Sequence, residues 1–300
     1  MNQTDKPGLA ISLRIFSGVL FTAMLICVKA VSENVPLGEI VFFRSAFALI
    51  PLVAFLWLRQ EFPGGLATRR PIGHLIRASF GAMAMFASFA AIARLNVAEA
   101  ILIAQLSPIL MALTAAILLS EKLTVWRIGG LALGFAGVIV LVWPELGGTH
   151  SDTTRLIGFA AGLLAAGLTA FALIMVRSLN SSESPGAIAF YFVIASMVGG
   201  LITLPWGWVT PTGTTLLILI GAGLFGGLAH IAMTLAFRYA EASRLAPFEY
   251  VALLWPILAD LLIFQLPLST SFLLAAPLVL GGAAFAASEN KRSKKAKVTA

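Results

Sequence analysis

Polar side chains inside long apolar runs are the first candidates for chemistry in this chain. Glu249 lies in APFEYVALLWP, His230 in GLFGGLAHIAMTLAF and Gln105 in ILIAQLSPIL. A charged group is costly to expose to lipid, so such residues usually face other helices or a wet cavity. We expect Glu249 either to hold a substrate ammonium group or a coupling proton, or to form a structural ion pair with Arg244.

His230 and three aromatic side chains extend this predicted site. A neutral imidazole can hydrogen-bond a substrate or relay a proton, and an interhelical hydrogen bond is the structural alternative. Phe86, Tyr250 and Trp255 are candidates for a wall that stacks on a flat or apolar substrate, with packing against helices or lipid as the alternative. The full set of predicted substrate-binding residues is Gln105, His230, Glu249, Tyr250, Trp255 and Phe86.

Arg44, in IVFFRSAF, is the cation placed most deeply in an apolar run. Glu39 precedes it by a little more than one helical turn, so we expect a structural ion pair between them rather than a substrate-carboxylate site. The single cysteine, Cys27, cannot form an intramolecular disulfide, and no metal-ligand or cofactor motif can be built around it. We therefore predict no metal and no cofactor.

The composition is that of a polytopic membrane protein. Hydrophobic residues make up 59% of the 300 positions and charged residues 11%, and the mean hydropathy is +0.97. The 27 glycines suit close helix packing in lipid, and Gly130, Gly134 and Gly137 are spaced as a packing surface. The net charge of +7 comes from cations in short loops and at the tail, which indicates membrane orientation rather than nucleic-acid binding.

Ten apolar segments separated by Gly, Pro and charged residues are each about as long as a membrane-spanning helix. Most Lys and Arg residues fall on one side of the resulting topology, so both termini are expected to be cytoplasmic. Residues 94–124 are expected to form one spanning helix, with Gln105 and Pro108 turned away from lipid. The predicted spans are about 13–33, 38–58, 73–93, 98–119, 125–143, 156–176, 187–205, 215–237, 245–264 and 270–288.

An internal repeat divides the chain into two halves. RLNVAEAILIAQLSPIL at 94–110 aligns with RYAEASRLAPFEYVALL at 238–254, which places Glu249 over Gln105. Because five spans is an odd number, the second unit must cross the membrane upside down. The predicted fold is all-α and integral to the membrane, with ten transmembrane helices as two inverted five-helix repeats around a central cavity. The repeats cover 13–143 and 156–288, followed by a basic cytoplasmic tail at 289–300.

Both halves resemble the EamA family of the drug/metabolite transporter superfamily. The resemblance covers FASFAAIARLNVAEAILIAQLSPILMALTAAILLSEKLTVWRIGGLALGFAGVIVLVWP and FRYAEASRLAPFEYVALLWPILADLLIF, including the Ser-Pro and Glu-Lys-Leu-Thr elements of the first. One departure is QLPLS at 265–269, where the family usually has Gly-Glu-Arg/Lys-Leu-Ser. The resemblance implies a ten-helix basket whose first, third, fourth, sixth, eighth and ninth spans line a central cavity.

The family resemblance also implies a secondary carrier for small metabolites in the bacterial cytoplasmic (inner) membrane. Similarity to amino-acid exporters, including the aromatic amino-acid exporter type, favours amino-acid export, and a vitamin carrier of the riboflavin type is the alternative. No GxxxxGK[ST] loop is present, and no acid or histidine cluster with catalytic spacing, so an ATPase or intramembrane enzyme is disfavoured. A channel is disfavoured by the inverted two-fold repeat. The expected partners are a small-molecule substrate and the lipid bilayer.

Overall fold

The computed structural model describes residues 6–119, 124–147, 152–180, 182–240, 245, 248 and 251–298, and in this part of the chain all regular structure is helical. Two short 3₁₀ turns lie in connections, at Gly64–Leu66 and Leu204–Trp206. The α-helices are α1 Pro7–Val31, α2 Leu37–Leu58, α3 Pro71–Arg94, α4 Val97–Ala104, α5 Ser107–Leu119, α6 Val125–Gly147, α7 Thr153–Leu179, α8 Pro185–Ile202, α9 Gly213–Tyr239, α11 Leu254–Leu262 and α12 Thr270–Val298.

Within the described residues, eight segments are long and apolar enough to cross a membrane. Seven of them are single helices, and the eighth, Val97–Ile117, combines α4 with most of α5. The apolar part of α12, Thr270–Ala286, is a shorter candidate. The prediction of a helical, multi-pass membrane protein is therefore confirmed.

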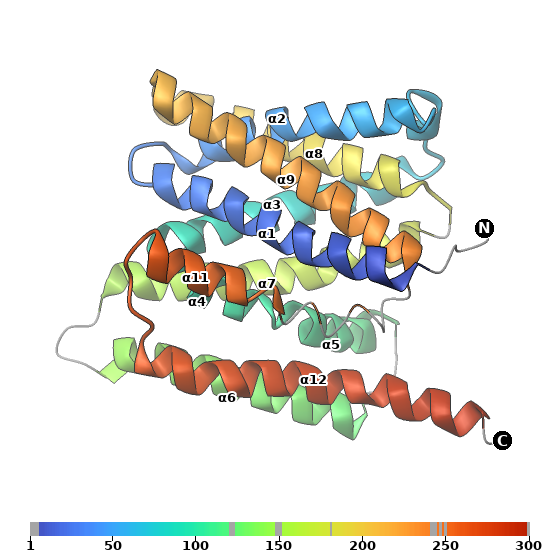
Figure 1. The fold of residues 1–300 in the computed structure, drawn as a ribbon, viewed down its shortest axis with the longest axis vertical. Coiled ribbons are helices and arrows are strands. Elements are labelled where there is room, and N and C mark those ends of the chain that lie inside the picture. Colours follow the sequence, from blue (N-terminus) through green and yellow to red (C-terminus); the bar gives the residue numbers. More distant parts are fainter. Residues whose placement is uncertain are drawn as a thin grey trace.

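The helices form a bundle in which α2 and α8 lie on one side and α6 and α12 on the other (Figure 1). The start of α1 and the end of α12 lie at the same end of the bundle, which we call the terminal end (Figure 1). The other end, where α1 turns into α2, is called the distal end. The largest contacts between the two halves join α1 to α9, α3 to α7, and α6 to α12, so the halves are interleaved.

Glycine lets α6 and α12 approach closely. A Cβ atom placed on Gly130 would lie 2.6 Å from the carbonyl oxygen of Gly282, and one on Gly137 would lie 2.7 Å from Cγ2 of Val279. Contacts this short leave no space for a side chain, so the packing role predicted for these glycines is confirmed.

The stretch predicted as one helix at 94–124 is broken, which corrects the sequence prediction. It begins with the end of α3 at Arg94 and is interrupted again between α4 and α5, at Gln105 and Leu106. Pro108 has no N–H, so the carbonyl group of Ala104 lacks its usual helical donor. The N–H of Leu106 instead donates to Ile103 at 3.0 Å, in the tighter i→i+3 pattern.

Candidate functional site

Three predicted site residues lie where helices of the two halves meet. His230 on α9 contacts Phe21 on α1 edge to face, with 4.9 Å between ring centroids. Phe86 on α3 lies near α8, since its Cε2 is 3.5 Å from a Cβ built on Gly199. These contacts fit both predicted alternatives, a substrate-lining wall and interhelical packing.

Trp255 on α11 lies beside α1. Its Cδ1 atom is 3.4 Å from a Cβ built on Gly18, and its indole Nε1 is buried without a hydrogen-bond partner. An unpaired buried N–H is unfavourable, so this group can donate to a ligand without breaking an existing bond.

Gln105 is half-buried at the break between α4 and α5. Glu249, Tyr250 and Arg244 lie outside the described residues, so the structure leaves the pairing of Glu249 with Gln105, and with Arg244, untested. The Glu-Lys-Leu part of the family-like turn at 121–123 lies outside them as well.

Arg44 is more deeply buried than the sequence suggested, with 2% of its surface exposed. Its Nε lies 3.4 Å from Sδ of Met24 on α1, and its Nη2 lies 3.0 Å from a Cβ built on Gly226 of α9. Its Nη1 is buried with no hydrogen-bond partner. The guanidinium group therefore sits among α1, α2 and α9.

The predicted ion pair between Arg44 and Glu39 is wrong. Glu39 is fully buried, and its Oε2 accepts a hydrogen bond from the N–H of Val209 at 3.0 Å, while its Oε1 has no partner. Residues five apart on a helix point about 140° away from each other, whereas partners on one face are three or four apart. The spacing thus directs the two side chains to different neighbours.

Arg77 on α3 is a second, half-buried cation, and it was not among the predicted site residues. Its guanidinium carbon lies 4.3 Å from the ring centroid of Phe192 on α8. Its Nε and Nη1 are buried without hydrogen-bond partners. The predicted span at 73–93 contains Arg77, so its position inside an apolar segment was the available signal.

The guanidinium group of Arg44 approaches α9 at Gly226, one helical turn before His230. Among the described residues no carboxylate forms an ion pair with Arg44 or Arg77. A guanidinium group keeps its charge in proteins, so the interior carries at least two positive charges without a described counter-ion.

Asp260 ties the two halves together at the distal end. This fully buried residue of α11 accepts hydrogen bonds from the N–H groups of Val97 at 3.1 Å and Ala98 at 2.7 Å. These are the first residues of α4, where free N–H groups and the helix dipole favour an anion. Asp260 was not predicted, although a lone acid inside LLWPILADLLIF is a recognisable signal.

An ion-pair network surrounds this contact. Glu99 completes the capping box at the start of α4 and pairs with Arg155 of α7 at 3.0 Å. Arg155 also pairs with Glu145 of α6 at 2.7 Å. Lys29 of α1 donates to the carbonyl oxygen of Leu95 at 2.9 Å. The network joins helices of both halves at the distal end, because Arg155 lies on α7, whereas Glu99, Glu145 and Lys29 lie on α4, α6 and α1.

A buried pair joins the halves at the terminal end. Nε2 of His74 on α3 lies 3.1 Å from Oε2 of Glu183, just before α8. Oε1 of Glu183 accepts a hydrogen bond from the N–H of Arg69 at 3.1 Å. Burial raises the pKa of the Glu183 carboxyl, but hydrogen bonds from His74, Thr68 and Arg69 outweigh it and leave that pKa below its ordinary value.

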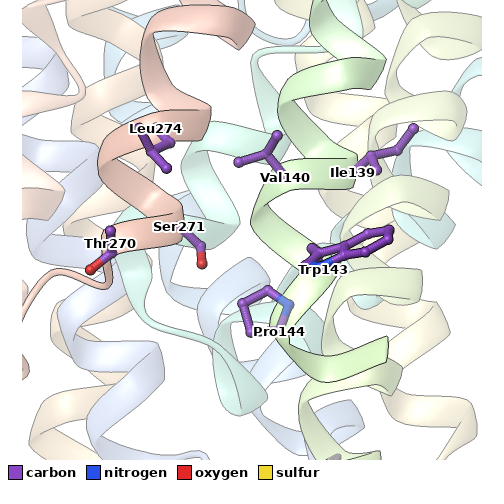
Figure 2. A pocket seen from close by; sticks show the side chains of 7 residues that line it. All are labelled: Ile139, Val140, Trp143, Pro144, Thr270, Ser271 and Leu274. Atoms are coloured by element: carbon purple, nitrogen blue, oxygen red, sulfur yellow. The ribbon is translucent and has the colours of Figure 1, made fainter. Parts of the chain in front are cut away.

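Two cavities lie away from the predicted site residues. One lies between α6 and α12 and is lined by Trp143 and Pro144 of the first helix and by Thr270 and Ser271 of the second (Figure 2). The other lies at the distal end and is lined by Glu33, Asn34, Arg94 and other residues of the α1–α2 turn, α3, α7 and the region after α8. Neither cavity is lined by any of the six predicted substrate-binding residues.

Comparison with known proteins identifies transporters. Residues 8–143 match the EamA-like transporter family. The chain is 27% identical to a riboflavin transporter of Rhizobium johnstonii over 95% of both chains, and 28% identical to the pseudopaline exporter CntI of Pseudomonas aeruginosa over 81% of this chain and 83% of the exporter. It is 27% identical to human solute carrier family 35 member G1 over 86% and 73% of the two chains. A solved crystal structure covers 96% of this chain with 22% identity and a TM-score of 0.66, which shows a shared fold.

Proposed function

We propose that this chain is a secondary carrier of the EamA-like transporter family that moves small metabolites by alternating access, since the model of that family matches residues 8–143 and transporters 27% and 28% identical match 95% and 81% of the chain. The observation that carries the mechanism is that polar contacts join the halves at both ends of the bundle. They are the Asp260 and Arg155 contacts at the distal end and the His74–Glu183 contact at the terminal end. Breaking one set while keeping the other would open the interior to one side at a time.

We propose that the two halves, 13–143 and 156–288, are inverted repeats in a ten-helix fold. Reciprocal packing supports this: α1 packs on α9 as α7 packs on α3, and α2 packs on α9 as α8 packs on α3. Those pairs interchange when α1, α2 and α3 are matched with α7, α8 and α9. A two-fold axis in the membrane plane would produce such an exchange.

The site between the halves is proposed to contain the six residues predicted from the sequence. His230, Phe86 and Trp255 lie at interhelical contacts, which supports their inclusion. Gln105 is included because the α4–α5 break frees backbone carbonyl groups beside it, and such breaks often accompany transport sites. Glu249 and Tyr250 are proposed from their positions in the sequence alone.

Two cargoes are proposed for this carrier. Amino-acid export follows from the resemblance of the chain to amino-acid exporters, and riboflavin-type vitamin transport is the alternative, which the name of the Rhizobium relative supports. The proposed location is the bacterial cytoplasmic (inner) membrane, with both termini and the basic tail in the cytoplasm, where the distribution of Lys and Arg favours them.

Counterflow in proteoliposomes tests the function. Vesicles containing the purified protein would be preloaded with one unlabelled compound at a time, and uptake of the same compound in labelled form would be measured. The panel would include neutral, aromatic and acidic amino acids, succinate and riboflavin. Exchange of amino acids supports the first cargo, and exchange of riboflavin alone supports the second. Uptake equal to that of protein-free vesicles for every compound would contradict the carrier function for these classes.

A further inference from the structure

We propose that Arg44 and Arg77 bind the carboxylate groups of the substrate, and that the substrate is a small organic acid with net negative charge. This inference rests on the proposed transport function and names its substrate class. It begins with the buried nitrogen atoms Nη1 of Arg44 and Nε and Nη1 of Arg77, which have no hydrogen-bond partners.

An unpaired buried guanidinium group is unfavourable because water is excluded and the charge cannot be lost. Either arginine could be replaced in evolution by an apolar residue, because an apolar side chain would be more favourable inside the bundle than an unpaired charge. The unpaired arginines are therefore best explained by an anion that is absent while the transporter is empty. A carboxylate fits the planar, forked donors of arginine better than other common metabolite groups except phosphate.

Neighbouring residues hold each guanidinium group while leaving donor atoms free. Met24 contacts Nε of Arg44 at 3.4 Å, and the ring of Phe192 lies 4.3 Å from the guanidinium carbon of Arg77. Glycine gives each group room: a Cβ on Gly81 would lie 2.6 Å from Nη1 of Arg77. Donors that are already oriented lose less side-chain entropy when an anion binds.

The two arginines lie at different interhelical contacts. Arg44 lies where α2 meets α9, and Arg77 lies where α3 meets α8. Their contacts Met24 and Phe192 pack in the same apolar core of the bundle, so both charges border one region of the interior. Two separate cations match two anionic groups, as in a dicarboxylate or an acidic amino acid. Neutral riboflavin would leave both unpaired, and a neutral amino acid has one carboxylate and could pair with only one of them.

Ligand-dependent thermal unfolding of the full-length protein in detergent tests this site. Succinate and glutamate should raise the Tm of the wild type, because a ligand that binds only the folded state stabilises it. Arg44→Gln or Arg77→Gln should weaken succinate binding by about 10- to 100-fold, the loss expected when a charged hydrogen bond is removed. Lysine at either position should retain part of the affinity, because the charge remains without the fork.

The matched control is Arg59→Gln, which removes a partly exposed arginine at the end of α2 that pairs with Glu61 at 3.0 Å. It should respond to succinate like the wild type. The Tm without ligand separates binding from structure: the proposal expects Arg44→Gln to be at least as stable as the wild type. A structural role would give a less stable variant whose succinate shift is unchanged, and that result would overturn the proposal.

Counterflow with the same variants separates this inference from the transport function. Exchange of riboflavin or neutral amino acids that is unchanged in Arg44→Gln and Arg77→Gln would refute the anion site and leave the carrier intact. Arginine-dependent succinate binding without exchange of any compound would support the site and contradict the carrier. Exchange of inorganic phosphate in preference to succinate and glutamate would overturn the assignment to carboxylates.

Discussion

Glu39 and Arg44 lie five residues apart on α2, and each meets a different neighbour. Glu39 accepts a hydrogen bond from the backbone of Val209, and Arg44 reaches Met24 and the surface of α9. For a single buried charged residue, the hydrogen-bond partners within the protein determine whether the group is free to bind a ligand. Glu183 has partners for both carboxylate oxygens, whereas Arg44 keeps a free donor. Glu183 is therefore a structural contact between the halves, whereas Arg44 is a candidate for substrate binding.

The His74–Glu183 contact predicts how stability depends on pH. The pKa of Glu183 in the folded protein lies below its ordinary value, which applies to the unfolded chain. The stabilising contribution is therefore complete above the ordinary pKa and is lost as the pH falls through the folded value. We expect Glu183→Gln to show a smaller drop in Tm on acidification than the wild type, measured by thermal unfolding in detergent.

Glu61→Gln is the control for this prediction, because Glu61 forms a partly exposed pair with Arg59 at the same end of the bundle. It should retain the wild-type decline at low pH. The same decline in Glu183→Gln as in the wild type would show that the buried pair does not control acid stability.

At the scale of elements, α4 depends on a residue from the other half of the chain. Asp260 of α11 accepts the N–H groups of both Val97 and Ala98. Asparagine offers one acceptor oxygen in place of two and no negative charge, so Asp260→Asn should lower the free energy of unfolding by about 1–3 kcal/mol. Thermal or chemical unfolding of the purified variant measures the loss.

Asp152→Asn is the matched comparison. Asp152 is an exposed N-cap of α7 whose Oδ1 accepts from Thr154 at 2.8 Å, and asparagine caps helices about as well as aspartate. Its effect should be much smaller than that of Asp260→Asn. Equal effects would show that the contact between α11 and α4 adds nothing beyond ordinary capping.

The contact between α2 and α9 offers a second element-scale prediction. A Cβ on Gly227 would lie 2.5 Å from the Pro51 ring and 2.9 Å from the carbonyl oxygen of Ala48, whereas one on Gly221 would meet atoms no closer than 3.6 Å. Backbone and ring atoms move little, so Gly227→Ala should lower the free energy of unfolding by about 1–3 kcal/mol. Gly221→Ala should be neutral or stabilising, because alanine favours the helix. Chemical unfolding of both variants measures their free energies of unfolding. Equal stability of Gly227→Ala and Gly221→Ala would contradict the close packing of α2 against α9.

At the scale of the whole molecule, the orientation in the membrane can be tested by labelling. We expect single cysteines at 147 and 212, at the distal end, to react with a membrane-impermeant thiol reagent added to intact cells. Cysteines at 64 and 182, at the terminal end, should react only after the membrane is opened. Cys27 would first be replaced by alanine to remove the natural thiol. The reverse pattern would place the termini outside the cell.

The sequence by itself determined the membrane class and the position of most described helices, because apolar length and charged ends are local properties. It also predicted a packing surface at Gly130, Gly134 and Gly137, since small residues at regular spacing identify a helix face, but not that α12 packs against it. The break between α4 and α5 was missed, although Pro108 was a visible cause. A proline inside an apolar run can bend, break or continue a helix, and its neighbours decide which.

Only the tertiary structure decided which polar residues meet. Asp260 contacts α4 across about 160 residues of sequence, and Arg77 lies half-buried against Phe192 of α8. The interleaving of the two halves brings these residues together, as when α3 packs against both α7 and α8. Hydropathy records how apolar a segment is but not which face of it turns toward which neighbour. For this reason the spans followed from the sequence, whereas the cationic interior and the contacts at both ends required the packed fold.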